Sequence, residues 1–330
     1  MAVKDEGQVE GLSRFFKTGP GQYGEGDKFL GIKVPVTRTV VKACWRDADW
    51  AELERCMASE YHEVRLAALL TLVEVFSKPK LCSKAMAAEN YFSEGFPKNQ
   101  FSAADKLGQL SKIFSKTGAA ENYFSQGFAK NQFSAAEGVR RQCVEFYLSH
   151  TEWINNWDLV DLSCYPLLGV WLLDKDRSLL YELARNGRTI WEQRIGIVST
   201  MTFVRHGELQ DTFNIADILL HHPHDLIHKA VGWLLREAGK RDKPALEAYL
   251  QETPDQVGGD ARPRTGGSSQ PVMPNGNQGL VMPGSDRASL PRYKQMPRTM
   301  LRYAIEKFPE RERQAYLRGE VESTRIIATD

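Results

Sequence analysis

Tryptophan and aspartate side chains at helical spacing suggest a site for a cation. In the segment WINNWDLVD (153–161), Trp153, Trp157 and Asp161 follow one another at intervals of four residues, which places them on one face of a helix. Each indole face attracts a cation by roughly 0.5–2 kcal/mol, and a carboxylate at about 4 Å adds about 4 kcal/mol at an effective dielectric near 20. The alternative is that the indoles are core residues and Asp161 caps a neighbouring helix.

Basic residues recur beside tryptophan on two later segments. Arg194 follows Trp191 by one helical turn, and Lys229, Trp233 and Arg236 have the spacing of a single helix face. Cations bind phosphates and aromatic rings bind sugars and bases, so aromatic and cationic groups on successive helices suit a nucleic acid. The same charges also fit ordinary solvated helix faces.

The net charge of the whole chain neither indicates nor excludes a nucleic-acid partner. The 330 residues include 43 basic and 42 acidic side chains, a net charge of +1, but a phosphate backbone responds to local patches. Residues 291–318 form such a patch, with eight Lys or Arg against three Glu, a local charge of +5. The chain lacks both a run of roughly 18 apolar residues and an apolar N-terminal leader, so we expect a cytoplasmic protein without a membrane partner.

Other possible sites are weak. The loop GPGQYG (19–24) has the spacing of a dinucleotide fingerprint, but it follows a helix end and precedes no helix start. The histidines at 221, 222, 224 and 228 are interrupted by Pro223, which favours capping and packing over a zinc site. Five scattered cysteines without a C-x-x-C pair indicate reduced thiols. We expect neither a metal nor a cofactor.

Helices must position these residues. Apolar residues recur with helical period at about 48–58, 62–77, 138–150, 153–163, 165–173, 177–186, 188–205, 211–220, 225–239 and 243–251. Helical periodicity resumes near 297–308 and 309–318, and nothing between 40 and 250 alternates for long enough to predict a sheet. Short polar connections between short helices predict an all-α fold, an α-solenoid of stacked helical pairs with a concave groove.

Two segments interrupt this pattern and define the expected domains. Residues 253–291 are rich in Pro, Gly, Ser and Asn and predict a flexible linker or loop between a helical-repeat domain, 1–252, and basic helices, 292–330, that pack on it. The sequence at 87–104 recurs at 119–136 with two differences in 18 positions, which indicates a duplicated insertion at about 82–137. No chemistry can be assigned to this repeat.

The chain resembles the AlkD-type DNA alkylation repair enzymes, which are DNA glycosylases built of HEAT-like repeats. The resemblance rests on six blocks in the family's order: FFKTGPGQYGEGDKFLGIKVP (15–35), YHEVRLAALLTLVEVF (61–76), INNWDLVDLS (154–163), IWEQRIGIVST (190–200), HPHDLIHKAVGWLLREAGK (222–240) and MPRTMLRYAIEKFPE (296–310). It implies base excision repair by hydrolytic release of cationic alkylated purines, such as 7-methylguanine and 3-methyladenine, from duplex DNA.

The resemblance also implies roles for individual residues. Asp161 matches the catalytic carboxylate, and Trp157 and Trp233 match two aromatic walls of the site. Arg194 matches an arginine that contacts the DNA backbone, whereas Lys33 stands where some members have a glutamine that contacts DNA. Asp161, Trp157 and Trp233 are the expected catalytic residues. The expected DNA-binding residues are Arg194, Lys33, Trp191, Lys229 and Arg236.

We expect a monomeric enzyme, and two other functions stay open. One is a catalytically silent DNA-binding relative, in which Asp161 is present but the groove is spoiled. The other is a HEAT-type scaffold for protein–protein interaction, in which the tryptophans are core residues. Steep salt dependence of DNA binding would separate the scaffold from the other two.

Overall fold

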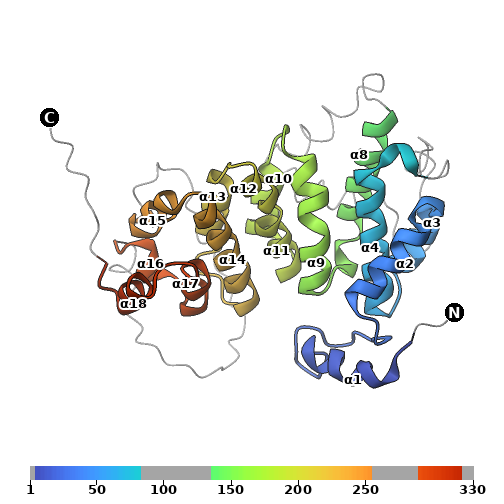
Figure 1. Cartoon of the computed structure of the whole chain (residues 1–330), viewed down its shortest axis with the longest axis horizontal. Coiled ribbons are helices and arrows are strands. Elements are labelled where there is room, and N and C mark those ends of the chain that lie inside the picture. The colour runs from blue at the N-terminus through green and yellow to red at the C-terminus, as the bar shows by residue number, and fades with distance from the viewer. Residues whose placement is uncertain (1–3, 83–134, 255–288, 322–330) are drawn as a thin grey trace, which may run out of the picture. The chain divides into compact units, whose positions relative to one another are not determined.

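The computed structural model describes residues 4–82, 135–254 and 289–321, and every regular element in these ranges is a helix (Figure 1). The β-type pairing in these ranges consists of one isolated parallel bridge, between Lys28 and Tyr61. The predicted all-α class is therefore confirmed. The duplicated insertion at 82–137 and the segment 253–291 lie almost wholly outside the described residues.

The chain divides into two compact units, residues 1–215 and 216–330. The first contains helices α1 (Glu6–Phe15), α2 (Val34–Cys44), α3 (Trp50–Met57), α4 (His62–Ser77), α8 (Ala135–Ser149), α9 (Trp157–Cys164), α10 (Ser178–Asn186), α11 (Ile190–Val198) and α12 (Met201–Arg205). Helix α13 (Gln210–Ile218) contains the boundary between the units. Short 3₁₀ turns, Trp45–Asp47, Pro79–Leu81 and Thr151–Trp153, link some of these helices.

Capping residues and a proline determine where several helices begin. Asp49 caps α3 by accepting a hydrogen bond from Glu52 N at 2.7 Å, and Thr189 caps α11 by accepting one from Glu192 N at 3.2 Å. Helix α2 has a proline in its first turn, where the missing N–H costs nothing. These local signals set the ends of helices whose apolar faces then pack together.

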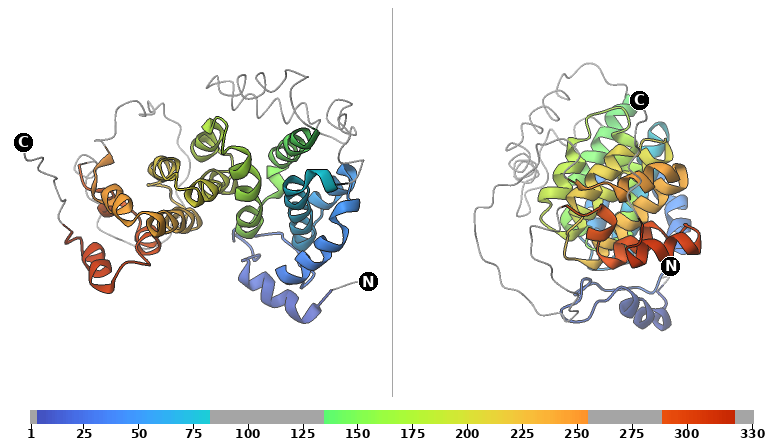
Figure 2. Two further views of the ribbon diagram at one scale, coloured as in Figure 1. Left: turned by 45° about the horizontal axis from the view of Figure 1, so that its top comes forward. Right: turned by 90° about the vertical axis from the view of Figure 1, so that its left-hand side faces the viewer.

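Helix α4 is the centre of the first unit. It packs against α2, α3, α8 and α9, and it buries residues on almost every side, including Leu66, Leu69 and Leu72. A helix that is apolar all round has this position because each of its faces meets a neighbour. Helix α9 in turn packs against α11, and α11 against α10, so the helices lie side by side in the views of Figures 1 and 2.

The second unit is built around α14 (Asp225–Arg241), which packs against α15 (Lys243–Gln251) and α17 (Arg298–Ala304). Helix α16 (Arg292–Gln295) packs against α15, and α18 (Glu310–Arg318) completes the unit. Gly232 allows α14 and α17 to approach closely, because a Cβ atom there would lie 2.5 Å from the Met300 carbonyl oxygen. Arg292, one of the basic residues of 291–318, is buried and donates to both oxygens of Asp217 at 2.7 and 3.0 Å.

Some expected helix bounds were wrong. Helix α2 was not expected, because its apolar pattern is short and has a proline at its second position. The helix expected at 153–163 begins only at Trp157, so Trp153 lies in the preceding 3₁₀ turn and not on the helix of Asp161. A turn at 199–200 divides the expected helix 188–205 into α11 and α12, and residues 165–169 form a π-helical turn that contains Pro166. A proline has no N–H for the α-helical pattern, which accounts for that change.

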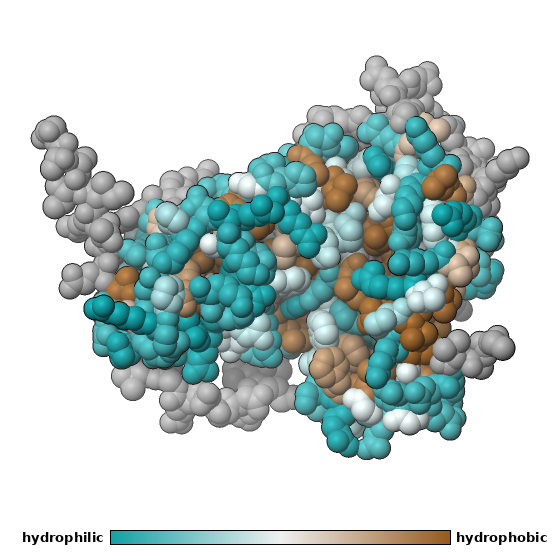
Figure 3. All heavy atoms as spheres, in the orientation of Figure 1, coloured by the Kyte–Doolittle hydropathy of each residue, from teal (hydrophilic) through white to brown (hydrophobic). Residues whose placement is uncertain are grey.

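Apolar side chains are unevenly exposed. On the face drawn in Figure 3, hydrophilic residues cover the second unit, whereas several apolar residues reach the surface of the first. The exposed large apolar residues of the first unit are Phe15, Val36, Val40, Leu81 and Val170. Among the described helices, none is both long and apolar enough to cross a membrane.

Candidate active site

The central feature of the first unit is an ion pair between Asp161 on α9 and Arg194 on α11. Arg194 Nε donates to Asp161 Oδ1 at 2.8 Å and Arg194 Nη2 donates to Asp161 Oδ2 at 2.7 Å. The Arg194 side chain is 6% exposed and the Asp161 side chain 14%. This two-point geometry fixes the carboxylate plane, because the planar guanidinium meets both oxygens at once.

Burial controls the charge of Asp161. Removal from water raises the pKa of the Asp161 carboxyl above its ordinary value, and the charge and hydrogen bonds of Arg194 offset part of this rise. The negative charge of Asp158, one turn earlier on α9, adds to the rise. Arg194 therefore favours the ionised form of a carboxyl whose other surroundings oppose ionisation.

Trp157 begins α9, one turn before Asp161. Asn156 is the N-cap residue of the helix, and its side-chain oxygen accepts from Trp157 N at 2.9 Å. The indole stacks on Phe16 with ring centroids 5.4 Å apart, and it meets the edge of Phe15 at 5.9 Å. Because Phe15 is 60% exposed and Trp157 is only partly buried, the two rings give an aromatic surface beside the carboxylate.

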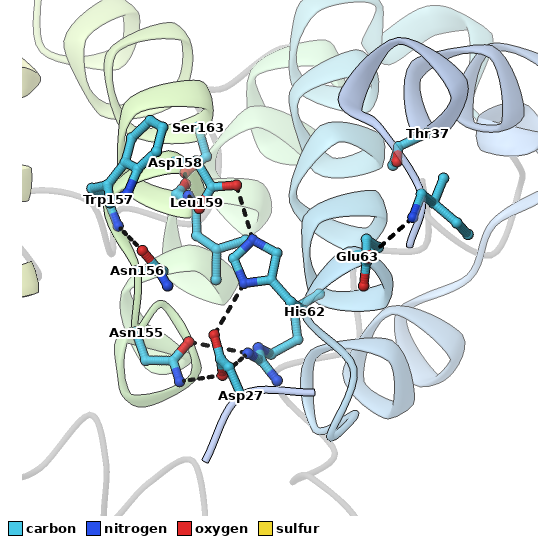
Figure 4. A network of polar contacts seen from close by, with 12 residues as sticks. Asp27, Thr37, His62, Glu63, Asn155, Asn156, Trp157, Asp158, Leu159 and Ser163 are labelled. Carbon is cyan, nitrogen blue, oxygen red and sulfur yellow. Dashed lines mark hydrogen bonds and ion pairs between the residues drawn. The ribbon is translucent and has the colours of Figure 1, made fainter. Parts of the chain in front are cut away.

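A buried polar network that the sequence did not predict lies at the starts of α4 and α9 (Figure 4). His62, the first residue of α4, contacts Asp27 Oδ2 through Nδ1 at 3.0 Å and Asp158 Oδ2 through Nε2 at 2.9 Å. Arg65 donates to Asp27 Oδ1 at 2.5 Å, and Asn155 donates to the same oxygen at 2.9 Å. The network joins the loop after α1 to the starts of α4 and α9.

Acid partners determine the protonation of this network. Burial alone would lower the pKa of His62, but the hydrogen bonds and charges of Asp158 and Asp27 raise it to about 9. Burial also opposes ionisation of Asp27, yet His62, Arg65 and Asn155 together hold the pKa of that carboxyl below its ordinary value. The imidazole is therefore an imidazolium at neutral pH.

The loop between α1 and α2 is held against α4 by a second acid and by stacked rings. Glu63 accepts from the backbone N–H groups of residues 30, 31 and 32 at 2.9–3.1 Å. Phe16 stacks on Phe29 at 5.1 Å, and both rings lie within 5 Å of the His62 ring. Gly31 has φ +83 and its Cβ position lies 2.0 Å from the Asp5 carbonyl oxygen, so only glycine fits there.

Two further predicted residues of the first unit lie in different environments. Trp191, on α11, is buried and its ring meets the edge of Tyr23 at 6.0 Å. Lys33 is exposed and directly precedes α2. Val36 and Val40 are exposed at helical spacing after it. Trp191 is thus mainly a packing residue in this structure, whereas Lys33 stands at the surface.

The predicted residues of the second unit share α14. Trp233 is partly buried, and Lys229 pairs with Asp225 at 2.7 Å. Arg236 pairs with Glu306 and, at 3.2 Å, with Glu237. Its guanidinium is thus shared between two carboxylates.

The histidine cluster has a capping function. His224 precedes α14, and its Nδ1 accepts from Leu226 N at 3.1 Å, while His228 Nε2 contacts the His222 carbonyl oxygen at 2.5 Å. Within residues 4–82, 135–254 and 289–321, no group of three or more His, Cys, Asp or Glu is arranged to hold a metal ion.

These features define a class of protein: a helical-repeat protein with a largely buried carboxylate–arginine pair one helical turn from a partly buried indole. The family model of the DNA alkylation repair enzyme family matches residues 1–92 and 98–308. The chain therefore belongs to the DNA alkylation repair enzyme family, as its sequence blocks predicted. A search of curated proteins found no match.

Proposed function

We propose that this protein is a DNA glycosylase that hydrolyses the N-glycosidic bond of cationic alkylated purines, such as 7-methylguanine and 3-methyladenine, in duplex DNA. The observation that supports this most is the Asp161 carboxylate, buried with Arg194 and one turn from Trp157. Family membership supports the wider statement, that the chain acts in DNA alkylation repair.

The chemistry suits these residues. An N7- or N3-alkylated purine already has a positive charge, so it leaves with the electrons of the glycosidic bond and needs no general acid. The deoxyribose becomes an oxocarbenium-like cation, which a nearby carboxylate stabilises electrostatically. Water then adds its oxygen to C1′, and its proton passes to Asp161 or to solvent. The products are the free base and an abasic sugar.

The aromatic residues would bind the cationic sugar. Trp157 offers a ring face next to Asp161, and Phe15 extends this surface outward. A cation over an indole gains roughly 0.5–2 kcal/mol. By family resemblance, Trp233 on α14 is a further aromatic residue proposed to act on the substrate.

Arg194 would act mainly on Asp161. The sequence suggested that it contacts the DNA backbone, but its side chain is 6% exposed and donates to both Asp161 oxygens. We therefore propose that Arg194 fixes the orientation and charge of the carboxylate. Contacts with phosphates would fall to Lys33, Lys229 and Arg236, which are wholly or partly exposed. We also propose that the enzyme is monomeric and cytoplasmic and acts in base excision repair.

The test is release of free 7-methylguanine from methylated duplex DNA under single-turnover conditions. The wild type is compared with Asp161→Asn and with Asp174→Asn, the same substitution at an acid whose side chain is 80% exposed. Loss of about 3–4 kcal/mol of transition-state stabilisation would slow release by Asp161→Asn by two to three orders of magnitude. Asp174→Asn should match the wild type.

Other outcomes would support the alternatives. Equal release by all three proteins would keep the glycosylase and reject Asp161 as its carboxylate. If DNA binds with a steep salt dependence but the wild type releases no base, the protein is a silent relative. If no DNA binds even at low salt, the nucleic-acid function is wrong and the scaffold remains.

A further inference from the structure

Six charged side chains of the first unit form a charge-balanced cluster around the start of α9. Three carboxylates face three cationic groups, and each contact between them is 3.0 Å or less. The carboxylates belong to Asp27, Asp158 and Asp161, and the cations to His62, Arg65 and Arg194. Only the pair Asp161–Arg194 is used in the reaction proposed above, so the other four groups need an explanation.

The hydrogen bonds of His62 require its charged form. An ionised carboxylate only accepts hydrogen bonds, and both ring nitrogens of His62 face carboxylate oxygens, so both nitrogens must carry a proton. Both acids also accept hydrogen bonds from other donors: Arg65 donates to Asp27, and Leu159 N donates to Asp158 Oδ1 at 2.9 Å. A neutral imidazole would leave one carboxylate oxygen facing a nitrogen lone pair.

We propose that His62 is a positioning residue of the glycosylase site, which holds Trp157 and keeps Asp161 ionised by neutralising Asp158. This inference rests on the proposed function. His62 itself is 1% exposed and cannot touch DNA, so it must act through its neighbours.

The first route is mechanical and passes through the aromatic rings. The His62 ring lies 4.9 Å from Phe16, and Phe16 stacks on Trp157 at 5.4 Å with an interplanar angle of 22°. The bond to Asp158 fixes the residue that follows Trp157 in the first turn of α9. The indole is thus held by its ring neighbour and by its own helix turn.

The second route is electrostatic and passes through Asp158. Asp158 and Asp161 are three residues apart on α9, so their Cβ atoms are about 5–6 Å apart. Two buried carboxylates at this range oppose each other's ionisation. The imidazolium lies 2.9 Å from Asp158 and offsets its charge, which leaves the Arg194 guanidinium to stabilise the Asp161 carboxylate.

Each element that contacts His62 contributes charged groups to its surroundings. The loop before α2 contributes Asp27, α9 contributes Asp158 and Asp161, and α4 itself contributes Arg65. Glu63, next to His62, is directed at the backbone of residues 30–32 and is not a partner of the imidazole. Removing one member of the cluster therefore leaves a defined excess charge.

Two single variants with opposite charge effects test the proposal. His62→Gln leaves Asp158 without its cation, so the acid limb of the pH–rate profile for 7-methylguanine release should shift to higher pH. The ratio of the variant rate to the wild-type rate is the measured quantity. If the limb shifts up by one pH unit, this ratio should be about tenfold lower at pH values below the limb than at pH values above it. Asp158→Asn removes the opposing carboxylate, so the limb should shift to lower pH.

The double variant His62→Gln/Asp158→Asn removes one charge of each sign and should return the acid limb to within a fraction of a pH unit of the wild type. His150→Gln is the matched control, since His150 is also buried and its Nδ1 contacts the Phe146 carbonyl oxygen at 2.8 Å. It should change stability without moving the limb. Urea unfolding confirms that each variant is folded. If His62→Gln is not folded, the double variant is compared with Asp158→Asn, because these two proteins differ only in the charge of His62.

The outcomes are separable from failure of the proposed function. Shifts of opposite sign with recovery in the double variant support the proposal, because a merely structural role would slow release by the same factor at every pH. Wild-type release with an acid limb that none of the variants moves overturns the role of His62 and keeps the glycosylase. If the wild type releases no base, both the proposed glycosylase function and the role of His62 in it are wrong.

Discussion

Arg194 donates to both oxygens of Asp161, and this pair joins α11 to α9 where neither side chain is more than 14% exposed. A buried pair of this kind contributes little net stability, because desolvation of two charges cancels most of their attraction. Its effect is on geometry and protonation. The arginine fixes the carboxylate and opposes the rise in the pKa of Asp161 that burial causes.

Replacing Arg194 by methionine should therefore raise the pKa of Asp161 further. The carboxylate must be ionised to stabilise a cationic sugar, so the acid limb of base release should shift to higher pH. An uncompensated buried charge should also lower the free energy of unfolding by about 3–5 kcal/mol. Urea unfolding and pH–rate profiles measure the two effects. The double variant Arg194→Met/Asp161→Asn should regain part of the lost stability, and no regain would show that the pair is not coupled.

The charge of His62 should make the protein less stable at alkaline pH. Its pKa in the folded protein is about 9, above the ordinary value of 6.5. A raised histidine pKa gives stability that is complete below about pH 6.5 and is lost as pH rises through about 9, up to about 3 kcal/mol. Urea unfolding between pH 6 and 10 should follow this decline, and His62→Gln should flatten it. An equally steep decline in the variant would show that other groups cause the loss.

In the second unit, Glu306 is expected to compete with DNA phosphates for Arg236. Glu306 pairs with Arg236, and its other oxygen lies 2.9 Å from Lys307 Nζ. Exposed ion pairs are worth up to about 1 kcal/mol, so Glu306→Gln should tighten duplex binding by about two- to fivefold. Glu310→Gln, at an acid whose side chain is 66% exposed, controls for the change in net charge. If both variants bind duplex DNA more tightly by the same factor, the release of Arg236 from Glu306 does not explain the gain in affinity.

Local patterns predicted the helices well and the polar network poorly. Helix α4 was predicted because its apolar residues repeat along one continuous segment, and Asp161 was singled out as a candidate because it stands one turn after an indole. His62, by contrast, contacts acids 35 and 96 residues away in sequence. No spacing rule connects residues that far apart. The only local signal is that Asp158 lies in the first turn of a helix, where an acid is ordinary.

The two-point contact of Arg194 was missed for the same reason. Arg194 and Asp161 are 33 residues apart, on helices that are not consecutive. The sequence therefore suggested a surface arginine for DNA, whereas packing of α11 on α9 buries it against the carboxylate. Helix periodicity indicates which face of a helix is apolar, but it does not indicate which charged residues of two such faces will meet.

Gly232 should be one of the least replaceable positions of the second unit. A Cβ atom there would lie 2.5 Å from both the Met300 carbonyl oxygen and Tyr303 Cβ, so α14 and α17 must separate to admit alanine. Overpacking of this kind costs about 1–3 kcal/mol.

Gly11 is the matched control, because its Cβ position in α1 meets nothing within 4 Å. Alanine should stabilise a helix interior there by about 0.5–1 kcal/mol. Thermal unfolding of Gly232→Ala and Gly11→Ala should thus shift in opposite directions, and a stable Gly232→Ala would mean that the two helices pack less closely than described. Because Trp233 follows Gly232 directly, separation of these helices should also weaken DNA binding, an effect that Gly11→Ala should not share.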